Sequence, residues 1–305
     1  MIMTKLMTKS VMKRLTRPLL LTGLVALACA PAHAAQTPLL GAELASFAAL
    51  AGAYATYGPD TIILGTVGAV TYITGGLGSS SGGEEINTPR VQAAVTQIDV
   101  AKQALTQMGA GTRLAAQLSG AVTLAPGVYD ATSLTTAAGT HLLLDGGGAD
   151  APVWVFNIPT FLETGAATLI SLLNAGAHTS VLWNIGGTAV IGDETTFIGT
   201  LLAASHISEA SGVNMQCGQA FSKAYVSIAA NSRSTSSPCA ASGTWAGSMY
   251  GLASNMVIVD GRAEPASTVP EPQTYALLLA GGAGLALRAS RRSLPIRARS
   301  TTDQA

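Results

Sequence analysis

Few side chains in this 305-residue chain are suited to acid–base or nucleophilic chemistry. Asp193 and Glu194 form the only tight acid pair in residues 118–255, and as neighbours on a strand they would point to opposite faces. Three histidines beyond the N-terminal segment lack a second His or Cys within four residues: His141, His178 and His206. Because catalysis needs positioned acids and bases, and a metal needs clustered ligands, the sequence predicts no enzyme, no cofactor and no metal site.

Gly78-Ser79-Ser80-Ser81-Gly82 fits the G-x-S-x-G pattern of a hydrolase nucleophile. That motif requires a strand before the serine and a helix that opens directly after it. Here Gly83-Glu84-Glu85 intervenes, and the next helix signal comes only at Thr88. The Gly- and Ser-rich residues 75–87 are therefore interpreted as a flexible linker.

Positive charge is concentrated at the two ends of the chain. Residues 35–269 hold six Lys and Arg against 14 Asp and Glu, so this body carries a net charge near −8. A body of this charge repels polyanions, which argues against nucleic acid or an anionic membrane as a partner.

The first 34 residues are typical of a secretory signal peptide. Basic residues precede the apolar residues 19–30, and Ala32-His33-Ala34 matches the small-residue site that signal peptidase cleaves. The mature chain is expected to start near Ala35 in an oxidising compartment. A lipoprotein processed at Cys29 is the alternative.

Two cysteines remain in the mature chain, Cys217 and Cys239, 22 residues apart. In an oxidising compartment they are expected to form a disulfide, which would contribute roughly 3 kcal/mol through loop entropy. Two buried thiols are the alternative.

The C-terminal part carries a second targeting signal, in addition to the signal peptide. Pro270, Glu271 and Pro272 precede a 14-residue apolar run at residues 274–287, and an arginine cluster follows it: Arg288, Arg291 and Arg292. This order resembles the PEP-CTERM sorting signal of Gram-negative bacteria. The resemblance implies a linker at residues 261–273 and a sorting tail at residues 274–305. It also implies an exosortase-type sorting enzyme as a partner, transient anchoring in the inner membrane, and delivery to the cell surface or extracellular matrix. A plain C-terminal membrane anchor is the alternative.

One long helix is predicted, over residues 89–108. Thr88 suits the N-cap, Pro89 suits the first helical position, and Gly109 is placed to end the helix. Apolar residues recur at three- and four-residue intervals, which gives the helix one apolar face. A helix with a single apolar stripe must lie against another element.

Short apolar segments separated by Gly, Asn or Asp follow the helix. They are residues 121–124, 141–145, 153–158, 168–173, 180–185, 188–191, 197–203 and 224–229. Strands this short favour a β-solenoid, whose coils stack around one apolar interior, with the helix along one side. Residues 35–260 are expected to form this domain, and residues 39–75 are expected to add several short strands and turns.

Four parts of the chain resemble the microbial ice-binding proteins: residues 40–52, 119–131, 142–158 and 180–203. The most specific stretches are Pro126-Gly127-Val128-Tyr129 and Thr196-Phe197-Ile198-Gly199-Thr200. The resemblance implies a mainly β fold, a right-handed discontinuous β-helix with one long α-helix packed alongside. It also implies that strands early in the sequence complete coils formed by later ones.

Ice binding requires no titratable group. It requires a flat, rigid face with hydroxyls and methyls at regular spacing, and Thr supplies both on a stiff side chain. The resemblance implies contacts at Thr-Ala/Gly-x-Thr/Asn steps, with which four places in this chain align in part. The predicted ice contacts are Thr196, Thr164, Thr168, Thr136, Thr195, Thr140, Ser208 and Ser211.

If these steps stack, Asp193, Glu194 and Glu209 put charge on or beside the face, and strongly hydrated carboxylates weaken a match to ice. The sequence therefore predicts a secreted, surface-sorted protein that adsorbs to ice crystals with moderate or weak activity. The alternative is an extracellular matrix or adhesin module that has the same fold and a degraded ice face, with polysaccharide as its partner.

Overall fold

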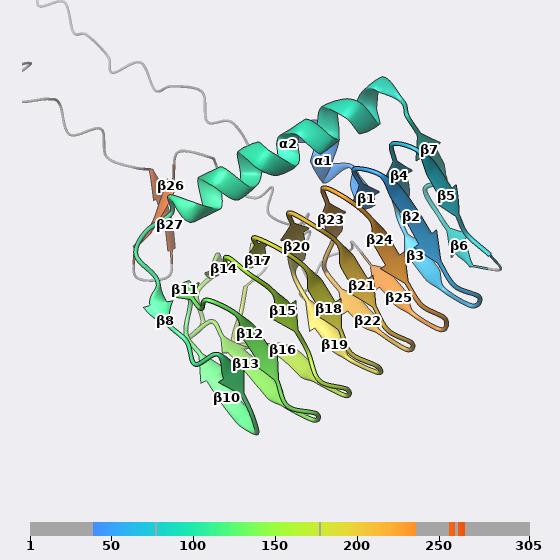
Figure 1. The fold of residues 1–305 in the computed structure, drawn as a ribbon. Coiled ribbons are helices and arrows are strands. Elements are labelled where there is room, and N and C mark those ends of the chain that lie inside the picture. Colours follow the sequence, from blue (N-terminus) through green and yellow to red (C-terminus); the bar gives the residue numbers. More distant parts are fainter. Residues whose placement is uncertain (1–38, 77, 177, 236–255, 260–261, 266–305) are drawn as a thin grey trace, which may run out of the picture. The chain divides into compact units, whose positions relative to one another are not determined.

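The computed structural model describes residues 39–76, 78–176, 178–235, 256–259 and 262–265. The body is mainly β and consists of three parallel sheets, numbered 1 to 3 below. Each turn of the chain places one strand in each sheet, so successive coils stack like those of a β-solenoid (Figure 1). The predicted mainly β, solenoid-like architecture is therefore confirmed.

Sheet 1 contains, in spatial order, β7 (Glu84–Ile86), β4 (Thr66–Ala69), β1 (Phe47–Ala51), β23 (Ala220–Ser222), β20 (Thr200–Ala203), β17 (Ser180–Ile185), β14 (Val153–Ile158), β11 (Gly127–Asp130) and β8 (Thr112–Arg113). Sheet 2 contains β5 (Tyr72–Thr74), β2 (Tyr54–Tyr57), β24 (Val226–Ile228), β21 (Ile207–Glu209), β18 (Ala189–Ile191), β15 (Leu162–Glu163), β12 (Leu134–Thr136) and β9 (Gln117–Leu118). Sheet 3 contains β10 (Ala121–Leu124), β13 (His141–Asp145), β16 (Leu169–Leu173), β19 (Thr196–Ile198), β22 (Asn214–Gln216), β25 (Arg233–Thr235), β3 (Ile62–Leu64) and β6 (Ser79–Ser80). The other elements are helices α1 (Gly41–Ala45) and α2 (Pro89–Thr106) and the antiparallel hairpin of β26 (Met256–Val259) and β27 (Arg262–Pro265).

The coils do not follow chain order. Strands β1 to β6 form two coils, β7 and α2 come next in the chain, and β8 begins the series of later coils. The last of these coils, β23 to β25, then pairs strand by strand with β1, β2 and β3. Early strands therefore complete the solenoid that later strands build, as the family resemblance implies.

Helix α2 covers the outer surface of sheet 1 (Figure 1). It begins at Pro89, and the hydroxyl of its N-cap Thr88 accepts a hydrogen bond from the backbone N–H of Val91. The apolar side chains of α2 pack against those of sheet 1 in one buried cluster, whose members include Val91, Ile98, Leu105, Val155, Leu182 and Leu202. The predicted helix and its apolar face are confirmed, although α2 ends at Thr106, two residues earlier than expected.

Polar contacts hold α2 in one register on sheet 1. The Lys102 ammonium donates to the carbonyls of Ile185, the last residue of β17, and Leu202, the residue before the last in β20. The Asp99 carboxylate forms an ion pair with Lys223. These contacts stop the helix from sliding along an otherwise apolar surface.

The interior of the solenoid is a second apolar cluster. Its largest side chains include Phe156 and Trp183, whose rings stack with centroids 3.9 Å apart, and Phe197 beside Trp183. Stacked rings at successive coils bury a large apolar area and keep the coils in register.

Two local predictions need correction. Residues 75–87 are not a linker, because β6 pairs with β3 and β7 pairs with β4. The predicted strand at residues 197–203 is broken at Gly199, where φ is +105° and an added Cβ would lie 2.6 Å from the carbonyl oxygen of Val181. The chain turns there from sheet 3 into sheet 1. The short helix α1 was also not expected within residues 39–75.

Several predictions fall outside the described residues. These are the signal peptide, the Pro-Glu-Pro motif with its arginine cluster, and Cys239. Cys217 is buried, and its predicted disulfide with Cys239 stays a prediction. In the described part of the chain, no helix has both the length and the hydrophobicity needed to cross a membrane.

Candidate functional site

The outer surface of sheet 2 carries a column of side chains in register. Strand alternation turns one residue per coil outward at this level. From one end of the sheet to the other, these residues are Gln117, Thr135, Glu163, Val190, Ser208, Ser227, Thr56 and Thr74. We call this set the hydroxyl column, because five of its eight members are Ser or Thr. Its spacing is that of neighbouring strands, about 4.8 Å.

Four aromatic rings stand beside the hydroxyl column. They lie two residues earlier on their strands or just before them: His206, Tyr225, Tyr54 and Tyr72. Neighbouring rings lie 4.5, 5.0 and 4.9 Å apart and within 7° of parallel, so they follow the coil spacing. We call them the ring stack. Stacked rings have little rotational freedom, and the hydroxyls of Thr56 and Ser227 beside them are hydrogen-bonded at 3.1 Å. This half of sheet 2 is therefore a rigid surface.

Charge is almost absent from this surface. Glu163 is the one ionisable carboxylate in the hydroxyl column, and neither that column nor the ring stack includes Lys or Arg. Within the described residues, no three His, Cys, Asp or Glu side chains are grouped as metal ligands. The surface offers hydroxyls and ring edges, which suit contact with ordered water.

The outer surface of sheet 3 has the same spacing and a different chemistry. Its corresponding column consists of Ala121, His141, Leu169, Thr196, Asn214, Arg233, Ile62 and Ser79. Leu169 and Ile62 are each 40% exposed, and Arg233 is exposed. Long side chains and a cation therefore interrupt this column.

Four of the predicted ice contacts point into the protein. Thr140, Thr168 and Thr195 are fully buried and Thr164 is 4% exposed. Their prediction as ice contacts is wrong, because a side chain without exposed surface cannot touch a crystal. These threonines stabilise the corner where each coil passes from sheet 2 to sheet 3.

The corner turns explain why this burial recurs. The residue before each of the three fully buried threonines has a positive φ: Gly139, Ala167 and Glu194. The following threonine turns inward, and in the coil of Thr168 its hydroxyl donates to the carbonyl of Gly165 at 2.7 Å. The hydroxyl of Thr164 accepts from the backbone N–H of Gly192 in the next coil. The Thr-Gly-x-x-Thr spacing is therefore that of a turn.

The other four predicted contacts lie in three different places. Thr136 is half-buried, and its hydroxyl is committed to the same corner through Gly165 and Thr168. Thr196 lies in the outward column of sheet 3, and Ser211 is exposed at a corner. Ser208 alone lies in the hydroxyl column. The structure therefore does not bring the eight residues together on one face.

Of the three acids that were expected on or beside the face, only Glu209 lies elsewhere in the structure. Asp193 and Glu194 are exposed at the corner between sheets 2 and 3. Glu209 is 1% exposed and points inward between Ile191 and Ile228 on the neighbouring strands. Within the described part of the chain, neither of its carboxylate oxygens has a hydrogen-bond partner, and burial raises its pKa to about 8. Glu209 therefore puts no charge on the surface.

Sequence reasoning missed Thr56, Thr74, Thr135 and Ser227. A signal for three of them was present in an aromatic-x-hydroxyl step that recurs at Tyr54-Ala55-Thr56, Tyr72-Ile73-Thr74 and Tyr225-Val226-Ser227. His206-Ile207-Ser208 is a fourth instance with an imidazole ring. Alternation places the ring and the hydroxyl on one face and the middle residue in the core.

Comparison with known proteins agrees with this architecture. Residues 40–233 match the family described as Ice-binding-like. An ice-binding protein from Nostoc sp. (strain HG1) is 31% identical over 201 residues, which are 63% of this chain and 71% of that protein. One from Leucosporidium sp. (strain AY30) is 28% identical over 207 residues, 60% of this chain and 78% of that protein. The crystal structure of an ice-binding protein from Antarctomyces psychrotrophicus superposes with a TM-score of 0.59 at 27% identity, covering 66% of this chain and 98% of that one. Because the matched residues make up well over half of the chain, it belongs to the Ice-binding-like family.

Proposed function

We propose that this protein adsorbs to ice through the outer surface of sheet 2. The observation that carries the proposal is the hydroxyl column, whose members lie in register on eight successive strands next to the ring stack. The proposed contacts are Ser208, Ser227, Thr56 and Thr74, with Thr135 at the far end of the sheet. Family membership and the names of the similar proteins support ice as the partner.

The physical basis is the order that this surface imposes on water. Parallel strands repeat one side-chain position at a fixed spacing, and the ring stack restricts movement of its neighbours. Hydroxyls held in such an array can keep a layer of water in an ice-like arrangement with little loss of entropy on freezing. No bond is made or broken, so binding requires no acid, base or cofactor.

The other two surfaces are less suitable. Helix α2 covers much of sheet 1. Sheet 3 presents Arg233 and the protruding Leu169 and Ile62. A cation holds its own hydration shell strongly, and its dehydration is costly.

We further propose moderate or weak activity. Glu163 and Val190 interrupt the hydroxyl column in the middle of the sheet, where a carboxylate and an aliphatic side chain replace hydroxyls. Asp193 and Glu194 add charge at the adjacent corner. The longest uninterrupted part of the array runs from Ser208 to Thr74.

Export and sorting also belong to this proposal. The N-terminal segment supports secretion, and Pro270-Glu271-Pro272 with the arginine cluster supports delivery to the cell surface by an exosortase-type enzyme. A test is cell fractionation of an epitope-tagged chain. Glu271→Ala should leave the protein in the membrane fraction, whereas equal surface display of both forms would contradict the sorting step.

Ice binding is tested by recrystallisation inhibition with the purified full chain. Micromolar protein should keep ice grains small, and a fluorescently labelled chain should coat ice crystals. Grain growth at the rate seen with an inert protein of equal size would contradict ice binding. That result would favour the alternative, an extracellular matrix or adhesin module with a degraded ice face.

A further inference from the structure

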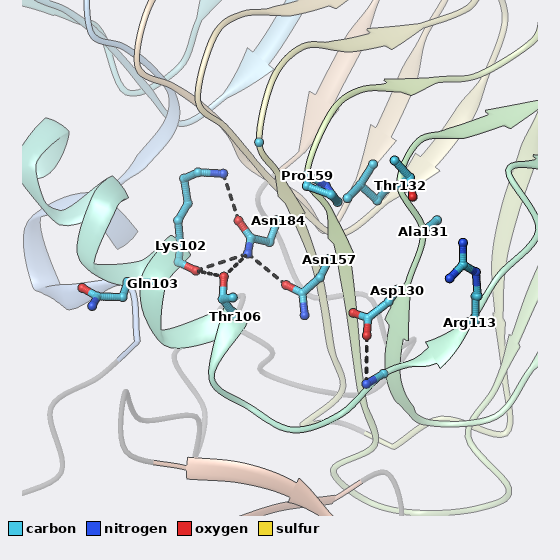
Figure 2. Close-up of a pocket in the computed structure, with 13 residues that line it drawn as sticks. Lys102, Gln103, Thr106, Arg113, Asp130, Ala131, Thr132, Asn157, Pro159 and Asn184 are labelled. Atoms are coloured by element: carbon cyan, nitrogen blue, oxygen red, sulfur yellow. Dashed lines mark hydrogen bonds between the residues drawn. The ribbon is translucent and has the colours of Figure 1, made fainter.

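A polar cavity lies beside α2, on the outer surface of sheet 1. The side chains in one register column of this sheet change in character along it, from polar to apolar: Arg113, Asp130, Asn157, Asn184, Leu202, Phe221 and Leu50. The apolar members are buried under α1 and α2. The polar members line a cavity of about 670 Å³ that α2 borders but does not fill (Figure 2). This volume is within the range of small-molecule sites.

Two polar residues build the wall of this cavity and have no donor left for a ligand. The two protons of the Asn184 amide nitrogen are shared among three acceptors within hydrogen-bond distance: the carbonyl of Lys102, the hydroxyl of Thr106 and the side-chain oxygen of Asn157 (Figure 2). The Lys102 ammonium donates to Asn184 and to two backbone carbonyls, which uses its three protons. Burial lowers the pKa of this lysine to about 8.

Three residues on successive strands keep polar atoms that face the cavity. The Asn157 amide nitrogen, the second carboxylate oxygen of Asp130 and the Arg113 guanidinium have no hydrogen-bond partner within the described residues. Asp130 and Arg113 lie in register on β11 and β8 but form no ion pair there, and Figure 2 shows the guanidinium directed away from the carboxylate. The cavity is therefore lined by a donor, an acceptor and a donor from three neighbouring strands, whose backbones are about 4.8 Å apart.

The charges in this row select the class of ligand. The carboxylate of Asp130 disfavours an anion, and the guanidinium of Arg113 disfavours a cation. A neutral molecule whose groups both donate and accept would satisfy all three side chains, and hydroxyl groups have this property. Pro159, which is exposed at the edge of the cavity, adds an apolar surface for the carbon face of such a molecule.

We propose that this cavity binds a single neutral saccharide unit, held by Asn157, Asp130 and Arg113. The site lies on sheet 1 and shares no residue with the hydroxyl column, so it stands independently of ice binding. A protein with both sites holds a glycan on one surface and leaves sheet 2 exposed.

The test is a chemical-shift titration of the ¹⁵N-labelled full chain with glucose, galactose, mannose and cellotriose. Glucuronate and glucosamine serve as charged counterparts. At least one neutral sugar should shift the amides of Asn157, Asp130 and Thr132 saturably and bind about tenfold more tightly than its charged counterpart. No shift with any neutral sugar, or preference for a charged one, would overturn the proposal.

Two variants test the side chains directly. Asp130→Asn keeps an acceptor for the backbone N–H of Gly111 and removes the second acceptor, and Arg113→Gln removes the guanidinium. Each should weaken saccharide binding about tenfold, because each leaves a polar group of the ligand unpaired. Arg233→Gln on sheet 3 is the matched control and should bind as wild type does. Equal binding by all four proteins would overturn the assignment. Recrystallisation inhibition by Asp130→Asn should be unchanged, which separates this site from the ice face.

Discussion

The outer surfaces of sheets 2 and 3 are built by the same coils at the same spacing, yet they differ in chemistry. In sheet 2 an aromatic-x-hydroxyl step repeats in four coils and produces a hydroxyl column beside a ring stack. In sheet 3 the corresponding column has no repeated residue type and includes, in order, Leu169, Thr196, Asn214 and Arg233. The solenoid therefore supplies regular spacing to every face, and the side chains decide which face can order water.

The largest expected effect concerns Glu209, which lies on β21 and points into the interior of the protein. Glu209 has a pKa of about 8 in the folded protein and an ordinary value of 4.5 when exposed. The folded state therefore binds the proton more tightly than the unfolded state does. The stability contributed by protonated Glu209 is fully present below about pH 4.5 and is lost as the pH rises to 8. The free energy of unfolding should fall by up to about 1.4 kcal/mol per pH unit in this window, several kcal/mol in all.

Urea denaturation at pH 5, 6.5 and 8 measures this effect, with Glu209→Gln as the comparison. The variant should match wild type at pH 5 and exceed it increasingly towards pH 8. The window stops at pH 8 because the lowered pKa of Lys102 has the opposite effect on stability above it. A constant difference between the two proteins would show that Glu209 is not buried as a neutral acid.

The second prediction tests the contrast between the two faces. Ser227→Arg places a cation in the hydroxyl column, and Asn214→Arg places the same side chain on sheet 3. The first should raise the protein concentration needed to inhibit recrystallisation by more than about tenfold, because a strongly hydrated charge must approach ice. Asn214→Arg should need a protein concentration within about twofold of that needed by the wild type. Equal losses in two folded variants would mean that the faces do not differ.

The third prediction compares a fully buried threonine with a half-buried one on an outer surface. The Thr168 hydroxyl contacts Gly165 and Thr136 inside a corner, whereas Thr196 lies in the outward column of sheet 3. Thr168→Val should lower the free energy of unfolding by about 1–2 kcal/mol, since it leaves buried groups unpaired. Thr196→Val should change stability by less than about 0.5 kcal/mol. Denaturant titration at pH 6 distinguishes them, and a greater loss in Thr196→Val would reverse the assignment.

The smallest expected effect is a gain in recrystallisation inhibition. Glu163→Gln removes the carboxylate from the hydroxyl column and should improve recrystallisation inhibition about twofold. The gain is small because a single exposed charge contributes little free energy. Glu194→Gln, at the neighbouring corner, is the control and should change it less. If Glu163→Gln weakens inhibition, the carboxylate takes part in binding and the proposed surface needs revision.

Local patterns predicted most of the elements. The N-cap at Thr88, Pro89 and the apolar repeat located α2, because these signals depend only on nearby residues. Apolar segments between turn residues likewise located β10, β13, β14 and β17 at their observed bounds. The candidate site was harder to predict, since Thr is used both in turns and on exposed strands, and its type does not say which.

Ser208 and Glu209 illustrate why residue type alone does not show which side chain faces the surface. They are neighbours on β21, and alternation alone requires that one points out and the other in. A hydrophilic pair offers no local reason to bury the acid, and Glu209 was expected to lie on or beside the surface. Its strand neighbours Ile191 and Ile228 show that the whole register of sheet 2 turns this position inward.

The sequence by itself therefore determined the helix, the strand segments, the family and the scarcity of charge, since each is a property of local pattern or composition. The tertiary structure decided which rows of side chains align, because β1 to β3 join β23 to β25 only when distant parts of the chain meet. It also decided that corner threonines are buried and that four aromatic-x-hydroxyl steps stand side by side. Regular spacing on a surface is a property of stacked coils, and no single segment contains it.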